Sequence, residues 1–240
     1  MRGGRLVKGV RFAGHVDAGA PATTCRAHSA QGADELLLLD IDASRNNRPP
    51  DFSALADVAA EAQVPLTFGG GLTDISLIRR ALEMGADKIC LTTSAIDRPG
   101  LIADAAQLFG AQAVVVGIDV TMHAGNPMLF DHRTGRELDA PTLDAWVSQA
   151  VGHGAGEIRL CAVDREGTRS GLDIALFERI RKLVNVPIIL EGGAGSLPDV
   201  ADAMKQGADS IALGTLLVFS DNNLVKVRRY LGEHGLRVRP

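Results

Sequence analysis

Two stretches of the chain repeat one another at a separation of about half its length. Residues 64–71 (VPLTFGGG) and 85–96 (GADKICLTTSAI) recur as residues 186–193 (VPIILEGG) and 207–218 (GADSIALGTLLV). The offset is 122 positions throughout, and 11 of 33 aligned residues are identical. Each copy has the pattern of a strand, a glycine-rich turn, a helix and a second strand. This repeat predicts two similar halves, with the chemistry where the strands end.

Strand-like apolar runs alternate with helix-like stretches along most of the chain. This alternation is typical of βα units around a parallel sheet. The strands that we expect lie at residues 35–42, 64–68, 87–91, 111–120, 157–163, 187–190 and 209–213. Residues 126–138 (NPMLFDHRTGREL) interrupt the rhythm and predict a β-hairpin.

The duplication favours a closed barrel over an open sheet. We therefore expect an α/β fold, a (β/α)8 TIM barrel built of two half-barrels, as a single phosphate-binding domain over residues 1–240. The repeat places the counterpart of strand 111–120 at or before residue 1, so the first barrel strand is missing from this chain. Either a strand precedes Met1, or the barrel closes in another way. Unpaired strand edges at such a gap predict weak stability.

Composition narrows the choice of partners and compartment. The net charge is −4 and the longest apolar runs are of strand length, which argues against nucleic acid and membranes as partners. Three cysteines without metal-like spacing argue against a disulfide framework and fit a reducing, cytoplasmic location. We found no signal peptide, and no residue pattern indicates a cofactor or a metal.

Two glycine-rich turns resemble phosphate sites. Exposed backbone N–H groups, a helix N-terminus and a hydroxyl from the next strand can together bind a phosphate. The first set is Gly70, Gly71, Thr92 and Thr93, and the second is Gly167, Gly192, Gly193, Gly214 and Thr215. A single Gly-Gly turn is more simply a tight connection. Two matched turns, each followed by a threonine at a strand end, favour a substrate with a phosphate at both ends.

Acidic residues follow several of the expected strands. Asp119 ends the apolar run AVVVGID, where it is either a general acid or base or a carboxylate that caps the next loop. Asp40 and Asp42 are weaker candidates of the same kind. Cys161 could be a nucleophile, but no histidine lies at a strand end to activate it, so it is more simply pocket lining.

Three charged residues stand at strand starts, on the opposite mouth. They are Glu35, Lys88 and Glu157, and the two glutamates are equivalent in the repeat. Residues there usually serve stability, as in a salt-bridged plug. The alternative is a gate into a central channel, and the residues alone leave both readings open.

Several motifs together carry a resemblance to a known family. They are GRLVKG, LTFGGGLTD, GADKICLTTSAI, FGAQAVVVGIDV, VDREGTRSGLD and PIILEGGAGSLPD. From residue 3 onward the chain is similar to the cyclase subunit of imidazole glycerol-phosphate synthase, a lyase of histidine biosynthesis. The resemblance implies a glutaminase partner that supplies ammonia. It also implies closure of an imidazole ring on a bis-phosphorylated ribulosyl-formimino substrate.

The resemblance also implies roles for individual residues. Asp119 becomes one of two catalytic aspartates, and both glycine-rich sets bind phosphate. The residues that it implies for the substrate pocket are Lys8, Asp40, Cys161, Glu166 and Glu191. Glu35, Lys88 and Glu157 form an ammonia gate, and Asp87 lies at the glutaminase interface.

This chain departs from the family pattern at the mouth that carries the chemistry. The second catalytic aspartate belongs to the missing strand. Cys161 stands in place of Thr, Glu166 in place of Asp, Glu191 in place of Ser and Thr92 in place of Asn. A carboxylate at Glu191 is electrostatically unfavourable beside a phosphate.

Residues 40–52 (DIDASRNNRPPDF) look more like a paralogous branch. That branch is associated with acetamidino-sugar formation in surface polysaccharides, where the barrel passes ammonia to a separate sugar amidotransferase. Three hypotheses therefore stand: a cyclase, such an ammonia-channelling paralogue, and a catalytically degenerate phosphate-binding barrel.

Overall fold

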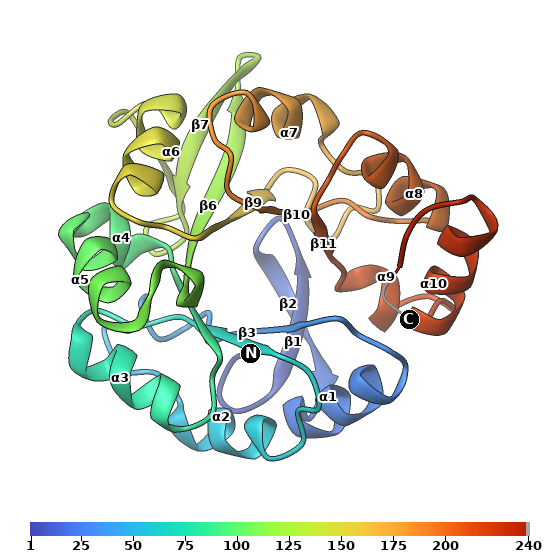
Figure 1. Cartoon of the computed structure of the whole chain (residues 1–240), viewed down its shortest axis with the longest axis horizontal. Helices are drawn as coiled ribbons and strands as arrows, with labels where there is room; N and C mark the ends of the chain where they lie inside the picture. The colour runs from blue at the N-terminus through green and yellow to red at the C-terminus, as the bar shows by residue number, and fades with distance from the viewer. Residues whose placement is uncertain (239–240) are drawn as a thin grey trace.

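Parallel strands form a barrel that is closed except at one seam. The computed structural model describes residues 1–238, and within them seven strands pair in parallel around a central axis (Figure 1). Their order is β3 (Leu36–Leu39), β4 (Leu66–Gly69), β5 (Lys88–Leu91), β6 (Val114–His123), β9 (Glu157–Ala162), β10 (Ile188–Glu191) and β11 (Ser210–Ala212). The predicted TIM-like barrel is thus confirmed, with an unsealed seam.

The seam lies between β3 and β11, which do not pair. The repeat predicted a missing strand at this place, and no strand within residues 1–238 fills it. An antiparallel hairpin of β1 (Leu6–Val10) and β2 (Ala13–Gly19) lies at one end of the seam. At the other end, Arg228 donates to the carbonyl oxygen of Gly32 over 2.7 Å. Between them is a cavity of about 780 Å³.

Helices surround the sheet (Figure 1). The longer ones are α1 (Pro21–Ala30), α2 (Phe52–Ala59), α3 (Ile75–Glu83), α5 (Gly100–Phe109), α6 (Leu143–Gly152), α7 (Ile174–Arg181), α8 (Leu197–Lys205) and α10 (Leu224–Glu233). Asp51 caps α2, because its carboxylate accepts from the Ala54 backbone N–H over 3.0 Å. No helix within the described residues is long and apolar enough to cross a bilayer.

Strand residues alternate between the outer core and the barrel axis. On β6, Val114, Val116 and Ile118 belong to the core between sheet and helices. Because successive strand residues point to opposite faces, Gly117 and Asp119 face the axis. On β9 the same alternation turns Glu157, Arg159 and Cys161 inward. The charged residues of these two strands therefore face the axis, and apolar residues of both strands pack in the core.

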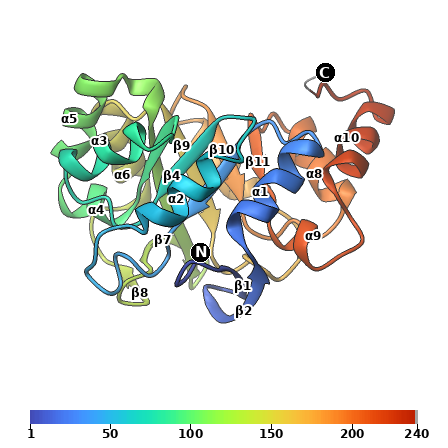
Figure 2. The same cartoon turned by 90° about the horizontal axis from the view of Figure 1, so that it is seen from below.

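Several element boundaries differ from the sequence prediction. The strand expected at 111–120 begins at Val114, because the 3-10 turn η1 (Ala111–Ala113) takes its first residues, and it continues to His123. There it pairs with β7 (Asn126–Asp131), which pairs with β8 (Arg136–Leu138), and this confirms the predicted hairpin. Strand β2 and the short helices α4 (Thr93–Asp97) and α9 (Thr215–Val218) were not predicted. Both β-hairpins extend from the same face of the barrel (Figure 2).

Candidate functional site

Asp119 lies at the mouth formed by the carboxyl ends of the strands. It is 4% exposed, and its Oδ1 accepts from Nη1 of Arg159 over 3.2 Å. The Nδ1 atom of His132 lies 3.6 Å from its other oxygen. The carboxylate predicted to carry catalysis is therefore buried beside a guanidinium and an imidazole.

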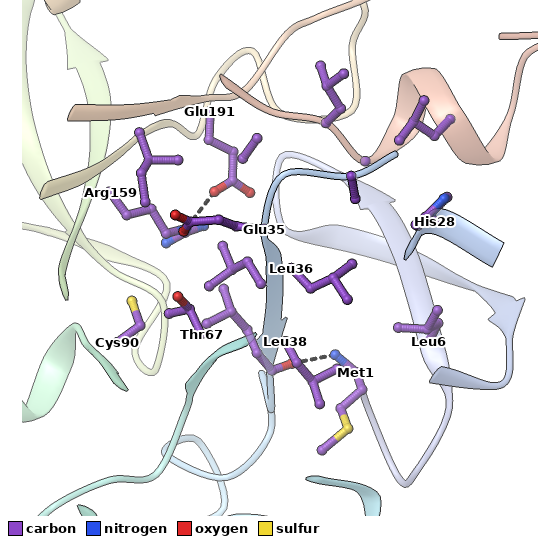
Figure 3. Close-up of a pocket in the computed structure, with 18 of the residues that line it drawn as sticks. Met1, Leu6, His28, Glu35, Leu36, Leu38, Thr67, Cys90, Arg159 and Glu191 are labelled. Carbon is purple, nitrogen blue, oxygen red and sulfur yellow. Dashed lines mark hydrogen bonds and ion pairs between the residues drawn. The ribbon is translucent and has the colours of Figure 1, made fainter. Parts of the chain in front are cut away.

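Five ionisable residues cross the floor of this mouth, and we call them the floor network. They are Lys8, Glu166, Glu191, Arg159 and Asp119. Lys8 Nζ lies 2.5 Å from Glu166 Oε1. Arg159 Nε lies 2.5 Å from Glu191 Oε2 (Figure 3). Cations therefore alternate with carboxylates, except where Glu166 and Glu191 are neighbours.

Arg159 is fully charged in this position. It is 3% exposed, and burial alone would lower its pKa, but Glu191 and Asp119 together raise that pKa well above its ordinary value. Burying the guanidinium alone would cost much free energy, and the two carboxylates beside it offset that cost.

Cys161 is a poor nucleophile. Burial raises the pKa of its thiol well above the ordinary value, so the thiolate is scarce at neutral pH. Atoms of Cys161, Glu166 and Glu191 lie within 4.8 Å of one another, a spacing that a metal ion could bridge. Both carboxylates already accept from a cation, however, so this group fits a resident metal poorly. Cys161 is also fully buried and does not line the large cavity, so the structure does not support its predicted place in the pocket wall.

The second predicted phosphate set comes together in one small cleft. Gly167, Gly192, Gly193, Gly214 and Thr215 all line it, together with Glu166. The Oγ1 atom of Thr215 is buried without a hydrogen-bond partner within the described residues. A buried hydroxyl without a partner is costly, and an anionic ligand in the cleft would satisfy it.

Glycine is required at this turn for two reasons. Gly192 and Gly193 have φ values of +98° and +101°, which favour glycine. A Cβ atom on Gly192 would also lie 2.5 Å from the carbonyl oxygen of Ala162. The tight-turn reading of these glycines is therefore correct, and it is compatible with a phosphate site.

The first predicted set lines the large cavity. Gly70, Gly71, Thr92 and Thr93 all contribute to its wall. The backbone N–H of Gly71 donates to the hydroxyl of Ser44 over 3.1 Å, which the sequence did not predict. A phosphate at this site must therefore displace Ser44 or bind through its hydroxyl group.

Asp40 serves the loop that follows β3. Both of its oxygens accept from Arg48 over 2.8 Å, and one also accepts from the backbone N–H of Asp51. Asp42 accepts from Arg2 over 2.8 Å. Asp40 lines the cavity, but its carboxylate is already hydrogen-bonded within the loop.

The three residues predicted to form the gate meet at the opposite mouth. Lys88 Nζ lies 2.9 Å from a Glu35 oxygen and 2.6 Å from a Glu157 oxygen. Burial lowers the pKa of Lys88, but hydrogen bonds to Glu157 and Glu35 outweigh burial and raise it. This cluster can serve as a plug or as a gate, and its role in ammonia passage remains a prediction.

Asp87, predicted to lie at a partner interface, makes a structural contact. Its carboxylate accepts from the backbone N–H of Leu66 at the start of β4, over 2.8 Å. Its repeat counterpart Asp209 accepts from Ile188 at the start of β10, over 2.9 Å. Both halves thus use the same bond, and the interface role of Asp87 remains a prediction.

Sequence reasoning missed Arg159, His132 and Ser44. Arg159 had a detectable signal, since it is a charged residue at an inward position of the apolar run IRLCAV. His132 and Ser44 lie in loops, where no sequence pattern indicates which residues they contact.

The chain matches the model of a protein family described as "Histidine biosynthesis protein" over residues 1–222. This chain belongs to that family. A relative in the histidine biosynthesis protein family, the "Imidazole glycerol phosphate synthase subunit HisF" of Alkaliphilus metalliredigens (strain QYMF), is 38% identical over 240 residues. The alignment covers 100% of this chain and 95% of that relative. The predicted resemblance to the cyclase subunit family is thereby confirmed.

Proposed function

We propose that this chain is the ammonia-accepting barrel subunit of a glutamine-dependent enzyme of the imidazole glycerol-phosphate synthase type. One observation carries the proposal. The cluster of Glu35, Lys88 and Glu157 stands at one mouth of the barrel, and Asp119 stands at the other mouth with two phosphate-like sites. A glutaminase subunit that docks at the first mouth can pass ammonia along the axis to a phosphorylated substrate at the second.

The first candidate reaction is closure of the imidazole ring in histidine biosynthesis. The name of the relative supports it, as do two phosphate-like sites that suit a bis-phosphorylated ribulosyl-formimino substrate. In this reaction Asp119 transfers a proton as general acid or base while ammonia adds to the substrate. The family resemblance implies a second catalytic aspartate on the strand that would fill the seam, and the described residues place no strand there.

The second candidate is the paralogous role, in which the barrel passes ammonia to a sugar amidotransferase. The floor network favours it. Asp119 is engaged by Arg159, and Glu191 places a carboxylate next to the second phosphate-like site. The cluster around Lys88 is fully assembled, which fits a chain that keeps ammonia passage and changes its substrate chemistry.

A direct assay separates the two candidates. The purified chain is incubated with ammonium salt and the ribulosyl-formimino bis-phosphate, and formation of imidazole glycerol phosphate is measured. Turnover that disappears in Asp119→Asn supports the cyclase. No turnover, combined with glutaminase binding and ammonia-dependent product from a sugar amidotransferase, supports the paralogue. A chain that binds no glutaminase and supports neither reaction is a degenerate barrel, and the proposal is then wrong.

A further inference from the structure

Glu191 raises an electrostatic problem at the mouth. It ends β10 and immediately precedes Gly192 and Gly193 of the second phosphate-like site. An oxygen of Glu191 also lies within 4.8 Å of an oxygen of Glu166. Two carboxylates so close to a phosphate would repel it unless each has a counter-ion.

The structure supplies both counter-ions. Lys8 pairs with Glu166, and Arg159 pairs with Glu191. Glu191 bonds to the Nε atom on one edge of the guanidinium, while Asp119 bonds to Nη1. Arg159 therefore neutralises the carboxylate that most disfavours phosphate binding.

Arg159 retains unused N–H donors. Its Nη2 atom has no hydrogen-bond partner within residues 1–238, although Nε and Nη1 both have one. The residue lines the large cavity, which is the space that a ligand would fill. A guanidinium held on two sides is preorganised to donate to an anionic oxygen on the third.

We propose that Arg159 is a substrate-binding and specificity-determining residue of this mouth. It neutralises Glu191 and donates from Nη2 to an anionic oxygen of a phosphorylated sugar. The inference rests on the proposed function, because that function supplies the phosphorylated substrate. It also explains how a chain with Glu191 at this position accepts such a ligand.

Calorimetric titration of the full chain with ribulose 1,5-bisphosphate, as a pentose bisphosphate probe, tests this role. Arg159→Met should weaken binding at least about 10-fold, because a donor is lost and Glu191 is left without its cation. Arg159→Met combined with Glu191→Gln should recover part of that loss, yet remain at least about 3-fold weaker than the original chain, since the donor is still absent. The affinity of Arg159→Lys for the probe should lie between that of the original chain and that of Arg159→Met.

The matched control is Arg179→Met. Arg179 pairs with Asp144 on the surface, far from the mouth in the fold, and the exchange of side chains is the same. It should bind the probe like the original chain. Circular dichroism melting of each variant verifies folding, and the charge-balanced double variant keeps the test valid if Arg159→Met alone does not fold.

Two results would overturn the inference alone. Binding by Arg159→Met that equals binding by the original chain excludes any role for the guanidinium. Full recovery in the double variant shows that Arg159 only neutralises Glu191 and does not touch the ligand. If the original chain itself does not bind the probe, the phosphorylated substrate of the proposed function is wrong, and this inference fails with it.

Discussion

In the proposed function, single residues at the mouth carry the chemistry of this barrel. Asp119 was the strongest catalytic candidate in the sequence, and the structure places Arg159 and His132 beside it. The carboxylate is buried and hydrogen-bonded to Arg159. Replacing it with a group of the same size should therefore reduce proton transfer strongly and change the fold little.

Asp119→Asn tests this view. The amide keeps the size of the side chain but cannot exchange a proton as a carboxylate does, so ammonia-dependent turnover should fall by about 10²–10⁴-fold. Affinity for a pentose bisphosphate should change by less than about 3-fold, because phosphate is bound elsewhere. Turnover is measured with saturating ammonium salt, and full activity in this variant refutes a catalytic role for Asp119.

The thiols allow a prediction about reactivity. Cys25, Cys90 and Cys161 are free and buried. Burial raises the pKa of Cys90 to about 11 and also raises that of Cys161, so the thiolate is scarce in the folded state at pH 8. Native protein should therefore react slowly with an aromatic disulfide reagent, and protein in denaturant should react rapidly. Rapid reaction of Cys161 in the native state would restore it as a nucleophile candidate.

At the scale of elements, the sequence predicted the alternating strands and helices well because their pattern is local. Each apolar run and each cap, such as Asp51, depends on residues a few positions away. Strand β2 was missed because it is half exposed and lacks an apolar run. The contact between Arg159 and Glu191 joins residues 32 positions apart, so it forms only when β9 pairs with β10. The two phosphate-like sets were found because the repeat compares distant segments directly.

The paired bonds at the strand starts give a prediction about stability. Asp87→Ala leaves the buried N–H of Leu66 without its acceptor and should cost about 1–3 kcal/mol of unfolding free energy. Asp209→Ala should cost a similar amount, since the repeat makes the same bond there. Asp202→Ala, which removes only an exposed pair with Lys205, should stay within about 0.5 kcal/mol. Urea denaturation measures all three, and equal effects for Asp87 and Asp202 would contradict the structural role.

Helix α1 should make stability depend on acid. Burial lowers the pKa of His28 below its usual 6.5, and its Nδ1 atom is buried without a partner within the described residues. The unfolded chain therefore binds a proton at His28 more readily than the folded chain does. The free energy of unfolding should decrease as the pH falls below about 6.5. Urea denaturation at pH 7 and pH 5 measures how much unfolding free energy is lost on acidification. This loss should be smaller in His28→Gln than in the original chain. An unchanged pH dependence in that variant would place the acid sensitivity elsewhere.

For the whole molecule, we expect the seam between β3 and β11 to limit stability. Two strand edges face a cavity of about 780 Å³ instead of a neighbouring strand. We expect the chain of 240 residues to melt broadly, and a strand added at the seam to sharpen and raise the transition. Calorimetry measures both forms. A single cooperative transition in the 240-residue chain, equal to that of a complete barrel, would show that the seam costs little.

We expect ammonia from a glutaminase to pass through this barrel to the mouth with the floor network. The most direct measurement supplies amide-¹⁵N glutamine, the glutaminase subunit and a large excess of unlabelled ammonium, and determines the isotope in the nitrogen of the product. Channelling through the barrel predicts predominantly ¹⁵N in the product, with the label lost when Lys88→Met disrupts the cluster with Glu35 and Glu157. Product nitrogen that matches the unlabelled pool in the original complex would contradict the account.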